Sequence, residues 1–389
     1  MTTKAHALRH SPVPSHGGLP TRVSAFLKKN IVLCIAAALA AFTSVIVPPD
    51  AAWLGYFDCK TLTCLFATLA VICALKDIHF FTVLAEKLVQ IAGNTRSAIL
   101  MLVAITYFGS MLLANDMALL TFLPLGYYAL SSTGKERYMA FTFIMQNIAA
   151  NLGGMVTPFG NPQNLFLYEK FHIPTGEFTR IMLPPFLFAA VLIAVCCLCV
   201  KKEPMTVCGR AHEPLPHGRT VLYLVLFAFA ILLVFRLVPY YWGLILIPAV
   251  LLVTDRHALV QVDYGLLFTF VAFFIFAGNM GRIGWVRGFF SGILEWNTLL
   301  ASVLSCQCIS NVPSAILLSQ FTDNYPALLL GVNIGGTGTL IASLASLITF
   351  REYTSHYAQQ TGRYLALFSA FNFGFLALLV GFCSLYFGI

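Results

Sequence analysis

The chain has 389 residues, of which 59% are hydrophobic and only 10% are charged. A soluble domain has about 25% charged residues, and the mean hydropathy of +0.84 is typical of a chain surrounded by lipid. The net charge of +8 lies mainly in loops, so it does not indicate a nucleic-acid partner. The composition therefore predicts one integral membrane unit and excludes an array of soluble domains.

Most of the eleven cysteines lie inside apolar runs. We expect them to be small buried hydrophobic residues rather than disulfides. No histidine cluster accompanies them, so no zinc site is expected. HExxH, GxSxG and a pair of catalytic aspartates are also absent from the sequence, and the chain is not expected to be an enzyme.

The first part of the chain predicts a tail, two crossings and a surface helix. Residues 1–29 are polar and basic, and we expect a disordered cytoplasmic tail. Apolar runs at 31–47 and 61–75 predict crossings. Residues 78–92 place apolar side chains on one helical face and charged ones on another, which predicts an amphipathic helix in the membrane interface.

Residues 96–131 predict a hairpin, because the apolar run is interrupted at Ala114-Asn115-Asp116. Each arm would be roughly 20–25 Å long at 1.5 Å per residue. This length is short for a crossing of about 30 Å and long for a stub that ends at the midplane. The sequence leaves both a re-entrant hairpin and two crossings open.

Residues 138–171 predict a helix that is broken inside the membrane. Two prolines and three glycines fall within the ten residues from Gly153 to Pro162, and a helix does not pass through them unbroken. The unpaired backbone groups need polar partners in lipid. A crossing at 182–200 follows and leads to a cytoplasmic loop at 201–219.

The second part of the chain repeats this order. A connecting helix at 220–239 and apolar runs at 241–253 and 266–276 come first, and a mixed stretch at 281–295 takes the place of the surface helix. The remaining segments are a hairpin at 296–321 interrupted at Ser310-Asn311-Val312-Pro313, a broken helix at 326–350 and a last crossing at 364–387.

The two broken helices resemble each other in sequence. When residues 333–347 are laid on residues 151–165, the Asn, both glycines, the Thr and the final Leu coincide. Broken apolar segments at matching places in two halves are typical of secondary transporters with internal repeats. We therefore expect repeat 1 at 30–200 and repeat 2 at 240–389, in an all-α fold with about nine full crossings plus two hairpins. The second arm of the second hairpin, from Ser314 to Phe321, is only about 12 Å long as a helix and cannot cross a bilayer. By symmetry, we expect each repeat to contain one re-entrant hairpin and one broken helix.

The distribution of positive charge predicts the topology. Six of the 23 Lys and Arg residues lie outside on this arrangement, and the rest lie inside or at the inner face; the six are Lys60, Lys170, Arg180, Arg236, Arg282 and Arg287. By the positive-inside rule, the N-terminus is cytoplasmic, the C-terminus is outside, and the two repeats are inverted in the plasma membrane.

Each interruption ends one half-helix and begins another. Free carbonyls at a helix end can bind a cation, and free amides at a helix start can bind carboxylate or oxyanion oxygens. If the four interruptions meet, they form one site for a small anion and a coupling cation. The residues predicted to line it are Asn115, Asp116, Asn151, Thr157, Gly160, Asn161, Gln163, Asn164, Ser310, Asn311, Asn333, Gly335, Gly336, Thr337, Thr339 and Ser343.

Asp116 is the acid predicted to lie deepest in the membrane, where a carboxylate is by default functional. It could bind a cation or carry a proton, and a sodium ion could be held by Asn115, Asp116 and Asn311. No other cofactor is expected. Interhelical hydrogen bonding is an equally good interpretation of each single Asn. Cys306 and Cys308 could favour arsenite, but residues two apart do not share a helical face.

Four stretches together resemble the ion-transporter superfamily: ANDMALLTFLPL at 114–125, TPFGNPQNLFLY at 157–168, CISNVPSAILLSQF at 308–321 and VNIGGTGTLIASLASLI at 332–348. The sequence is most similar to YbiR-type anion permeases, beside ArsB arsenite permeases and NhaD-type sodium/proton antiporters. It is more distantly similar to the citrate and dicarboxylate:sodium symporters.

The resemblance implies a scaffold domain, a transport domain, a homodimer and an elevator-like movement. In the symporters, Ser-Asn-Thr tips and the adjoining breaks hold sodium and the carboxylate. Here Ser310-Asn311 keeps two of these positions and Val312 replaces the hydroxyl. The tip Ala114-Asn115-Asp116 keeps the Asn and adds an acid, which favours proton coupling or a differently charged ligand. The leading hypothesis is anion transport coupled to Na⁺ or H⁺; a sodium/proton antiporter and an arsenite or antimonite efflux permease are the alternatives.

Overall fold

A computed structural model describes residues 31–205 and 215–389. The predicted N-terminal tail lies outside the described residues, as does part of the predicted loop at 201–219. The described residues form helices joined by short connections, and the β-pairing among them is a single isolated bridge between Asn94 and Pro204. The all-α class predicted from the sequence is confirmed.

The helices before residue 200 follow the predicted order. They are α2 (Ile31–Ile46), the 3₁₀ turn η1 (Ala51–Tyr56), α3 (Cys59–Asp77), α4 (Phe80–Gln90), α5 (Thr95–Gly109), α6 (Asn115–Ser131), η2 (Glu136–Tyr138), α7 (Met139–Gly153), η3 (Gly154–Val156), α8 (Pro162–Lys170) and α9 (Thr175–Leu198).

The helices after residue 215 make up the rest of the described chain. They are α10 (His217–Val234), α11 (Tyr241–Thr254), α12 (Arg256–Gln261), α13 (Tyr264–Arg282), α14 (Gly284–Ile309), α15 (Asn311–Leu318), α16 (Tyr325–Ile334), α17 (Leu344–His356), the turn η4 (Ala358–Gln360) and α18 (Thr361–Phe387). Asn297 has non-helical backbone angles inside α14, so α14 joins a surface segment to the first arm of the second hairpin.

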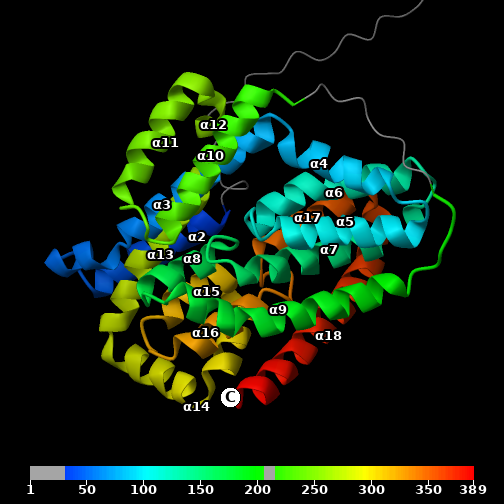
Figure 1. The fold of residues 1–389 in the computed structure, drawn as a ribbon. Helices are drawn as coiled ribbons and strands as arrows, with labels where there is room; N and C mark the ends of the chain where they lie inside the picture. The colour runs from blue at the N-terminus through cyan, green and yellow to red at the C-terminus, as the bar shows by residue number, and fades with distance from the viewer. Residues whose placement is uncertain (1–30, 206–214) are drawn as a thin grey trace, which may run out of the picture.

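The helices pack in two groups. In one group, α2 packs along α13, and α3 packs against α10, α11 and α12. In the other, α5 and α6 pack on α7, while α14 and α15 pack on α16. Figure 1 shows the first group at the upper left and the hairpin α5–α6 with α7 and α17 at the right. Helix α8 contacts both α3 and α15, so it lies where the two groups meet.

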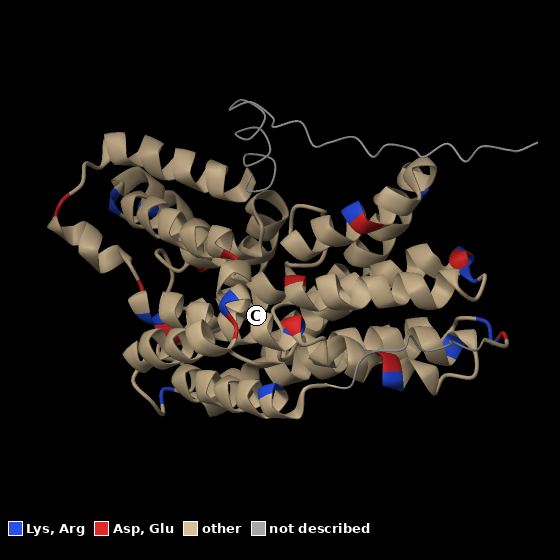
Figure 2. Cartoon of the chain, turned by 90° about the horizontal axis from the view of Figure 1, so that it is seen from above, with Lys and Arg blue, Asp and Glu red and all other residues tan. Residues whose placement is uncertain are grey.

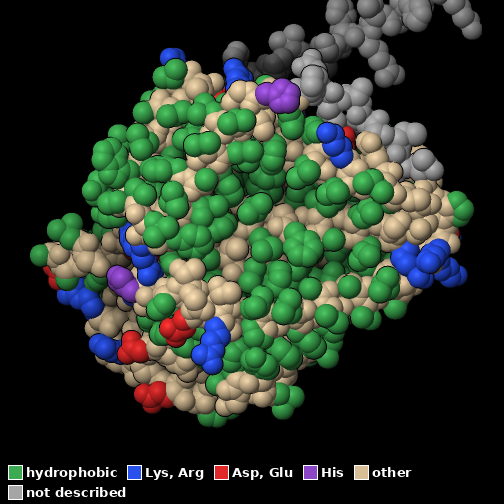
Figure 3. Space-filling view, in the orientation of Figure 1, with side chains coloured by type: hydrophobic (Ala, Val, Ile, Leu, Met, Phe, Trp, Pro, Cys, Tyr) green, Lys and Arg blue, Asp and Glu red, His purple; other side chains and the backbone are tan. Residues whose placement is uncertain are grey.

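Seven helical segments among the described residues are long and apolar enough to cross a membrane. They are Cys59–Asp77, Glu136–Val156, Thr175–Leu198, His217–Val234, Tyr264–Arg282, Gly284–Ile309 and Ala358–Phe387, and four shorter apolar helices accompany them. Charged residues lie mostly at helix ends and in loops (Figure 2), and the face drawn in Figure 3 is largely covered by hydrophobic side chains. This surface suits a multi-pass membrane protein.

The first break lies where backbones approach too closely for a side chain. Helix α7 ends at Gly153, and a Cβ there would lie 2.1 Å from the carbonyl oxygen of Tyr107. Pro162 occupies the first turn of α8, where its missing N–H is not needed. Glycine and proline therefore end one half-helix and begin the next.

The second hairpin has a shorter return arm than the first. Helix α15 begins at Asn311, three residues before the start at Ser314 that the sequence suggested, because Pro313 is tolerated in a first helical turn. Its eight residues span about 12 Å, whereas α6 has 17 residues. An arm of eight residues is too short to cross a bilayer.

Candidate functional site

The amide of Asn151 joins three of the four interruptions. Its Oδ1 accepts a hydrogen bond from Asn115 Nδ2 at the first hairpin tip (3.1 Å) and another from Ser343 Oγ in the second break (2.7 Å). Asn115 Nδ2 also lies 3.5 Å from Ser343 Oγ. Asn151 and Asn115 are buried, so these bonds form away from bulk water.

Asn333 makes the corresponding connection in the other direction. Its Oδ1 accepts from Asn161 Nδ2 and from Gln163 Nε2, both at 3.4 Å, and its own Nδ2 donates to Asn164 Oδ1 at 2.6 Å. All four side chains are almost fully buried. Each break is thus held by the Asn that ends the helix of the opposite break.

The two halves also use the same contact between break and hairpin. Thr157 Oγ1 donates to the carbonyl of Met111 at 2.7 Å, and Thr339 Oγ1 donates to the carbonyl of Gln307 at 3.1 Å. Both threonines lie six residues after the Asn of their own break, and both acceptors lie four residues before the Asn of their own hairpin tip. The internal similarity read from the sequence therefore corresponds to equivalent local structure.

The second hairpin tip completes the site. Ser310 has a φ of 75°, and the backbone N–H of Asn311 donates to the carbonyl of Ala342 at 3.0 Å. A Cβ on Gly336 would lie 3.1 Å from Asn311 Nδ2 and 3.6 Å from Asn151 Oδ1. Gly336 therefore separates the polar groups of the two halves, and any side chain there would enter this space.

Helix N-termini point to the same place. The N-cap residues of α6, α8 and α15 make no side-chain capping bond, while Ser343 caps α17 by accepting from the amide of Ala345 at 3.1 Å. Asn115 Oδ1 accepts from the amide of Asp116, and Asn311 Oδ1 accepts from the amide of Val312 and from Ser310 Oγ. In the first turn of α15, the N–H groups of Asn311 and Ser314 are also bonded to carbonyls, and Pro313 has none. Two helix starts among the described residues, those of α6 and α8, therefore keep amides that an anion can bind.

Three buried oxygens near the interruptions lack a hydrogen-bond partner among the described residues: Asp116 Oδ1, Asn161 Oδ1 and Gln163 Oε1. A buried acceptor without a partner costs about 1–3 kcal/mol. Such oxygens suit a ligand that brings a hydroxyl, a proton or a cation. The site therefore combines donors for an anion with acceptors for a second, positively charged or protonated group.

Asp116, whose depth in the membrane stays a prediction, differs in burial from the other acid near the breaks. It is only partly buried, whereas Glu169 at the end of α8 has a side chain that is 1% exposed. Glu169 is thus the more buried acid, and the apolar pattern could not show this because it lies at a helix end. Asp116 still adjoins the site, since its backbone amide donates to Asn115 Oδ1 at 3.0 Å.

The remaining predicted residues lie in the break segments. Gly160 packs against the backbone of Gly154, so a Cβ would meet its carbonyl oxygen at 2.4 Å. Thr337 bonds to the carbonyl of Ile334 at 2.6 Å, and Gly335 lies against Cys306. Cys306 is buried and Cys308 is exposed, so the two thiols do not form a common site. Among the described residues, no group of three or more His, Cys, Asp or Glu could hold a metal ion.

The sequence reading missed an ion-pair cluster that joins α8 to the other group of helices. Glu169 Oε2 lies 2.6 Å from Lys60 Nζ and 3.2 Å from Arg236 Nε. Arg236 also donates to the carbonyls of Tyr168 and Ile173, and its guanidinium lies 4.2 Å from the centre of the Tyr168 ring. We call Lys60, Glu169 and Arg236 the ion-pair latch.

A second missed feature is a buried polar cluster one turn before Asn151. Asn147 Nδ2 donates to Ser346 Oγ at 3.3 Å and to Asn372 Oδ1 at 3.4 Å. Asn151 Nδ2 donates to the carbonyl of Asn147 at 3.2 Å. Helix α18 is thereby connected to both broken helices. A buried Asn within an apolar helix was the available signal, and only the fold shows its partners.

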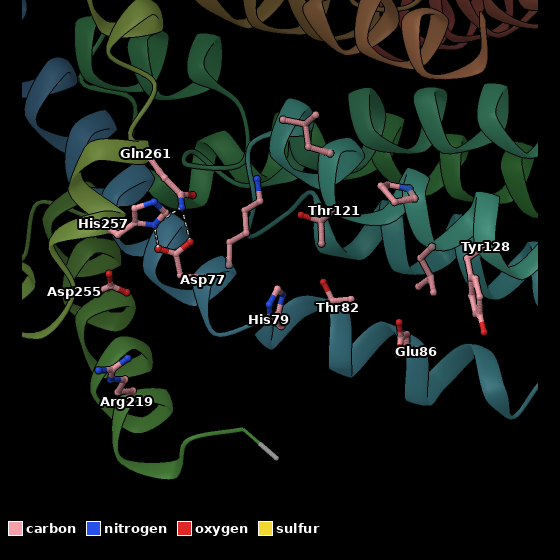
Figure 4. A pocket seen from close by; sticks show the side chains of 14 residues that line it. Asp77, His79, Thr82, Glu86, Thr121, Tyr128, Arg219, Asp255, His257 and Gln261 are labelled. Carbon is pink, nitrogen blue, oxygen red and sulfur yellow. Dashed lines mark hydrogen bonds and ion pairs between the residues drawn. The ribbon is translucent and has the colours of Figure 1, made fainter. Parts of the chain in front are cut away.

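A cavity of about 620 Å³ lies between α4 and α6 on one side and α3, α10 and α12 on the other. Figure 4 shows Asp77, His257 and Gln261 together at one side of it, facing Thr121 and Tyr128 of α6. Leu120, which lines the cavity, follows Asp116 by four residues. One helical turn separates such residues on the same face, so the cavity extends along α6 towards the hairpin tip.

The sequence matches a transporter family and two membrane proteins along most of its length. Residues 22–330 match the model of the CitMHS family, described as citrate transporter. An uncharacterized transporter of Methanocaldococcus jannaschii is 32% identical over 332 residues, which are 84% of this chain and 90% of that protein. The inner membrane protein YbiR of Escherichia coli is 29% identical over 313 residues, covering 77% and 81% of the two chains.

A solved structure supports the fold. The YdaH transporter of Alcanivorax borkumensis, described as having an unusual topology, superposes with a TM-score of 0.55 over 95% of this chain and 98% of that chain at 15% identity. The resemblance predicted from four sequence stretches is confirmed by the family match and by the similarity to YbiR. The chain therefore belongs to the citrate transporter family and is a multi-pass membrane transporter.

Proposed function

We propose that the protein is a secondary active transporter that carries a small anion, either a carboxylate or an inorganic oxyanion, across the plasma membrane together with Na⁺ or H⁺. The observation that carries the proposal is the convergence of both breaks and the first hairpin tip through Asn151 and Asn333, with the second hairpin tip bonded to the second break through Asn311. A site built from helix ends at the meeting point of two repeats is the usual substrate site of such carriers.

The chemistry of the site favours an anion that is bound by neutral donors. Uncapped helix starts supply amide N–H groups and a partial positive charge, and no Lys, Arg or His belongs to the interruptions. A substrate bound in this way needs no fixed counter-charge, so it can be released after the cation leaves. The unpartnered oxygens of Asn161 and Gln163 favour a substrate with a hydroxyl or a bound proton.

The proposed movement is elevator-like, with α5–α9 and α14–α18 carrying the site past α2, α3 and α10–α13. Two features of the boundary support it. The cavity lies at the Asp77 end of α3, whereas the ion-pair latch lies at the Lys60 end. The positive-inside rule assigns the Asp77 end to the cytoplasm, so this conformation would be open inward and closed outward. The same assignment gives the inverted repeats, the cytoplasmic N-terminus and the external C-terminus.

The alternatives receive less support from the site. An arsenite carrier would benefit from paired thiols, and Cys306 and Cys308 lie in different environments. A sodium/proton antiporter needs an ionisable group at the site, and Asp116 supplies one. An antiporter binds no anion, however, so the free amides at the uncapped helix starts would have no ligand. We therefore retain anion transport as the proposal and a homodimer in the lipid bilayer as its expected assembly.

The test is counterflow in proteoliposomes that contain the purified protein. Citrate, malate, sulfate, phosphate and arsenite are each offered inside the vesicle, and exchange with the labelled external anion is measured. We expect at least one anion to exchange in the wild type and to fail in Asn333→Ala, while Asn279→Ala in α13, which lies outside the site, retains exchange. Absence of exchange for every anion, together with sodium/proton exchange, would contradict the proposal and favour an antiporter.

A further inference from the structure

The backbone carbonyls at the first break converge on one side-chain nitrogen. Asn164 Nδ2 lies 3.2 Å from the carbonyl of Gly154, 3.1 Å from that of Met155 and 3.2 Å from that of Thr157. Asn164 is 0% exposed. These carbonyls come from the end of the first half-helix, which is where a helix presents its partial negative charge.

The second break has the same arrangement, built from a different residue. Gln307 Nε2 lies 2.9 Å from the carbonyl of Gly335, 3.1 Å from that of Thr337 and 3.3 Å from that of Val303 in its own helix. Gln307 belongs to the hairpin arm, whereas Asn164 belongs to the helix after the break. Met111, the counterpart of Gln307 in the first half, has no side-chain amide. At the first break, the side-chain amide of Asn164 donates to the carbonyls instead.

The orientation of both amides follows from their other contacts. Asn164 Oδ1 accepts from Asn333 Nδ2 at 2.6 Å, and Gln307 Oε1 accepts from the backbone N–H of Thr339 at 2.8 Å. Turning either amide over would place its oxygen against three carbonyl oxygens and its nitrogen against a donor. The nitrogen therefore faces the carbonyls in both cases.

A ring of carbonyl oxygens at broken helices is what a coupling sodium ion would require. At both breaks that ring already surrounds a side-chain NH₂ group, whose two hydrogens are shared among three carbonyl oxygens. An ion entering there would have to displace a buried amide and leave its donors unpaired, which costs free energy.

We propose that the side-chain amides of Asn164 and Gln307 occupy the positions that sodium ions would take at the two breaks, so that the transporter neither binds nor needs sodium there. This inference rests on the proposed function and bears on which cation, Na⁺ or H⁺, is coupled to the anion. The two residues position the break segments, and the Asp116 carboxyl is left as the ionisable group that adjoins the site. Proton coupling through Asp116 then needs no sodium ion at either break.

The experiment uses the full chain and sodium itself as the probe. Thermal unfolding is measured in NaCl and in choline chloride at equal ionic strength for the wild type, Asn164→Asp and Gln307→Glu. Each carboxylate keeps the acceptor oxygen and replaces the donor by a negative oxygen facing the carbonyls. Asn279→Asp, whose amide donates to Thr43 Oγ1 at 3.3 Å in α2, is the matched control for a buried charge outside the breaks.

We expect the wild-type unfolding temperature to be the same in both salts. The two break variants should be less stable in choline and should recover stability with a saturable dependence on sodium, which the Asn279→Asp control should lack. A saturable sodium effect on the wild type would overturn the inference, and so would folded break variants that do not respond to sodium.

A second variant and a second measurement decide the question if one variant fails to fold. If Asn164→Asp does not fold, the partly exposed Gln307→Glu and the wild type still decide the question, because each has its own expected response. Anion exchange by the wild type in sodium-free vesicles should equal that in sodium. Failure of every anion to exchange would count against the proposed function, whereas the salt dependence of unfolding needs no substrate and tests the inference alone.

Discussion

The ion-pair latch offers a quantitative test of the boundary between the two helix groups. Glu169→Gln keeps the shape of the side chain and removes its charge. Removing one partner of a buried ion pair costs about 3–5 kcal/mol, because the remaining charge is left without compensation. The side chains of Lys60 and Arg236 are 27% and 25% exposed, so water solvates them in part. We expect the lower end of this range, about 3 kcal/mol.

The expected change in unfolding temperature follows from the length of the chain. An unfolding entropy of about 2.1 cal/mol/K per residue gives roughly 0.8 kcal/mol/K for 389 residues. A loss of about 3 kcal/mol should therefore lower the unfolding temperature by about 4 °C. Thermal unfolding of the purified protein, followed by tryptophan fluorescence, measures this shift.

The two cations should contribute unequally. Arg236 also donates to the carbonyl of Ile173 at 3.3 Å and lies over the Tyr168 ring, whereas Lys60 forms an ion pair with Glu169 alone among the described residues. Arg236→Gln should therefore destabilise more than Lys60→Gln. In a double-mutant cycle, Glu169 and each cation should couple by more than about 0.5 kcal/mol, the usual limit for independent sites.

Glu352→Gln is the matched control. Glu352 forms an exposed pair with His356 at 3.5 Å, and such a pair contributes less than about 0.5 kcal/mol. If Glu169→Gln unfolds at the same temperature as the wild type, or if its coupling to both cations is absent, the latch does not hold α8 and the argument for a closed outer face fails.

The remaining predictions concern the site and one surface pair. Asp116→Asn should abolish the dependence of anion exchange on pH without lowering the unfolding temperature, because Oδ1 has no partner to lose; unchanged pH dependence in vesicles would refute the proton role. Asn151→Ala should stop exchange and cost about 1–3 kcal/mol, since two buried donors lose their acceptor; retained exchange would place the substrate elsewhere. The Arg282 guanidinium donates hydrogen bonds to Asp50 and holds the pKa of that carboxyl below its usual range. The contribution of Asp50 to stability is therefore present at neutral pH and is lost as the pH falls through the lowered pKa. The unfolding temperatures of wild type and Asp50→Asn should therefore differ at pH 7 and converge in acid, and a difference that grows on acidification would contradict this.

The sequence by itself determined the class of protein and the places where its helices break. Long apolar runs require a bilayer, and the glycines and prolines between Gly153 and Pro162 interrupt a helix wherever it lies. The match between the segments after Asn151 and Asn333 indicated two related halves. These are local properties of the chain, so composition and spacing reveal them.

The tertiary structure decided which polar groups satisfy one another. Ser343 and Asn151 are 192 positions apart in the chain, and Glu169 meets Lys60 and Arg236 only after α3, α8 and α10 have packed. Asn164 was predicted as a possible ligand for cargo, and its nitrogen instead lies among three backbone carbonyls. A hydrogen-bond partner depends on the position of distant backbone, because the bond forms only within about 3.5 Å. Spacing along the chain cannot supply that information.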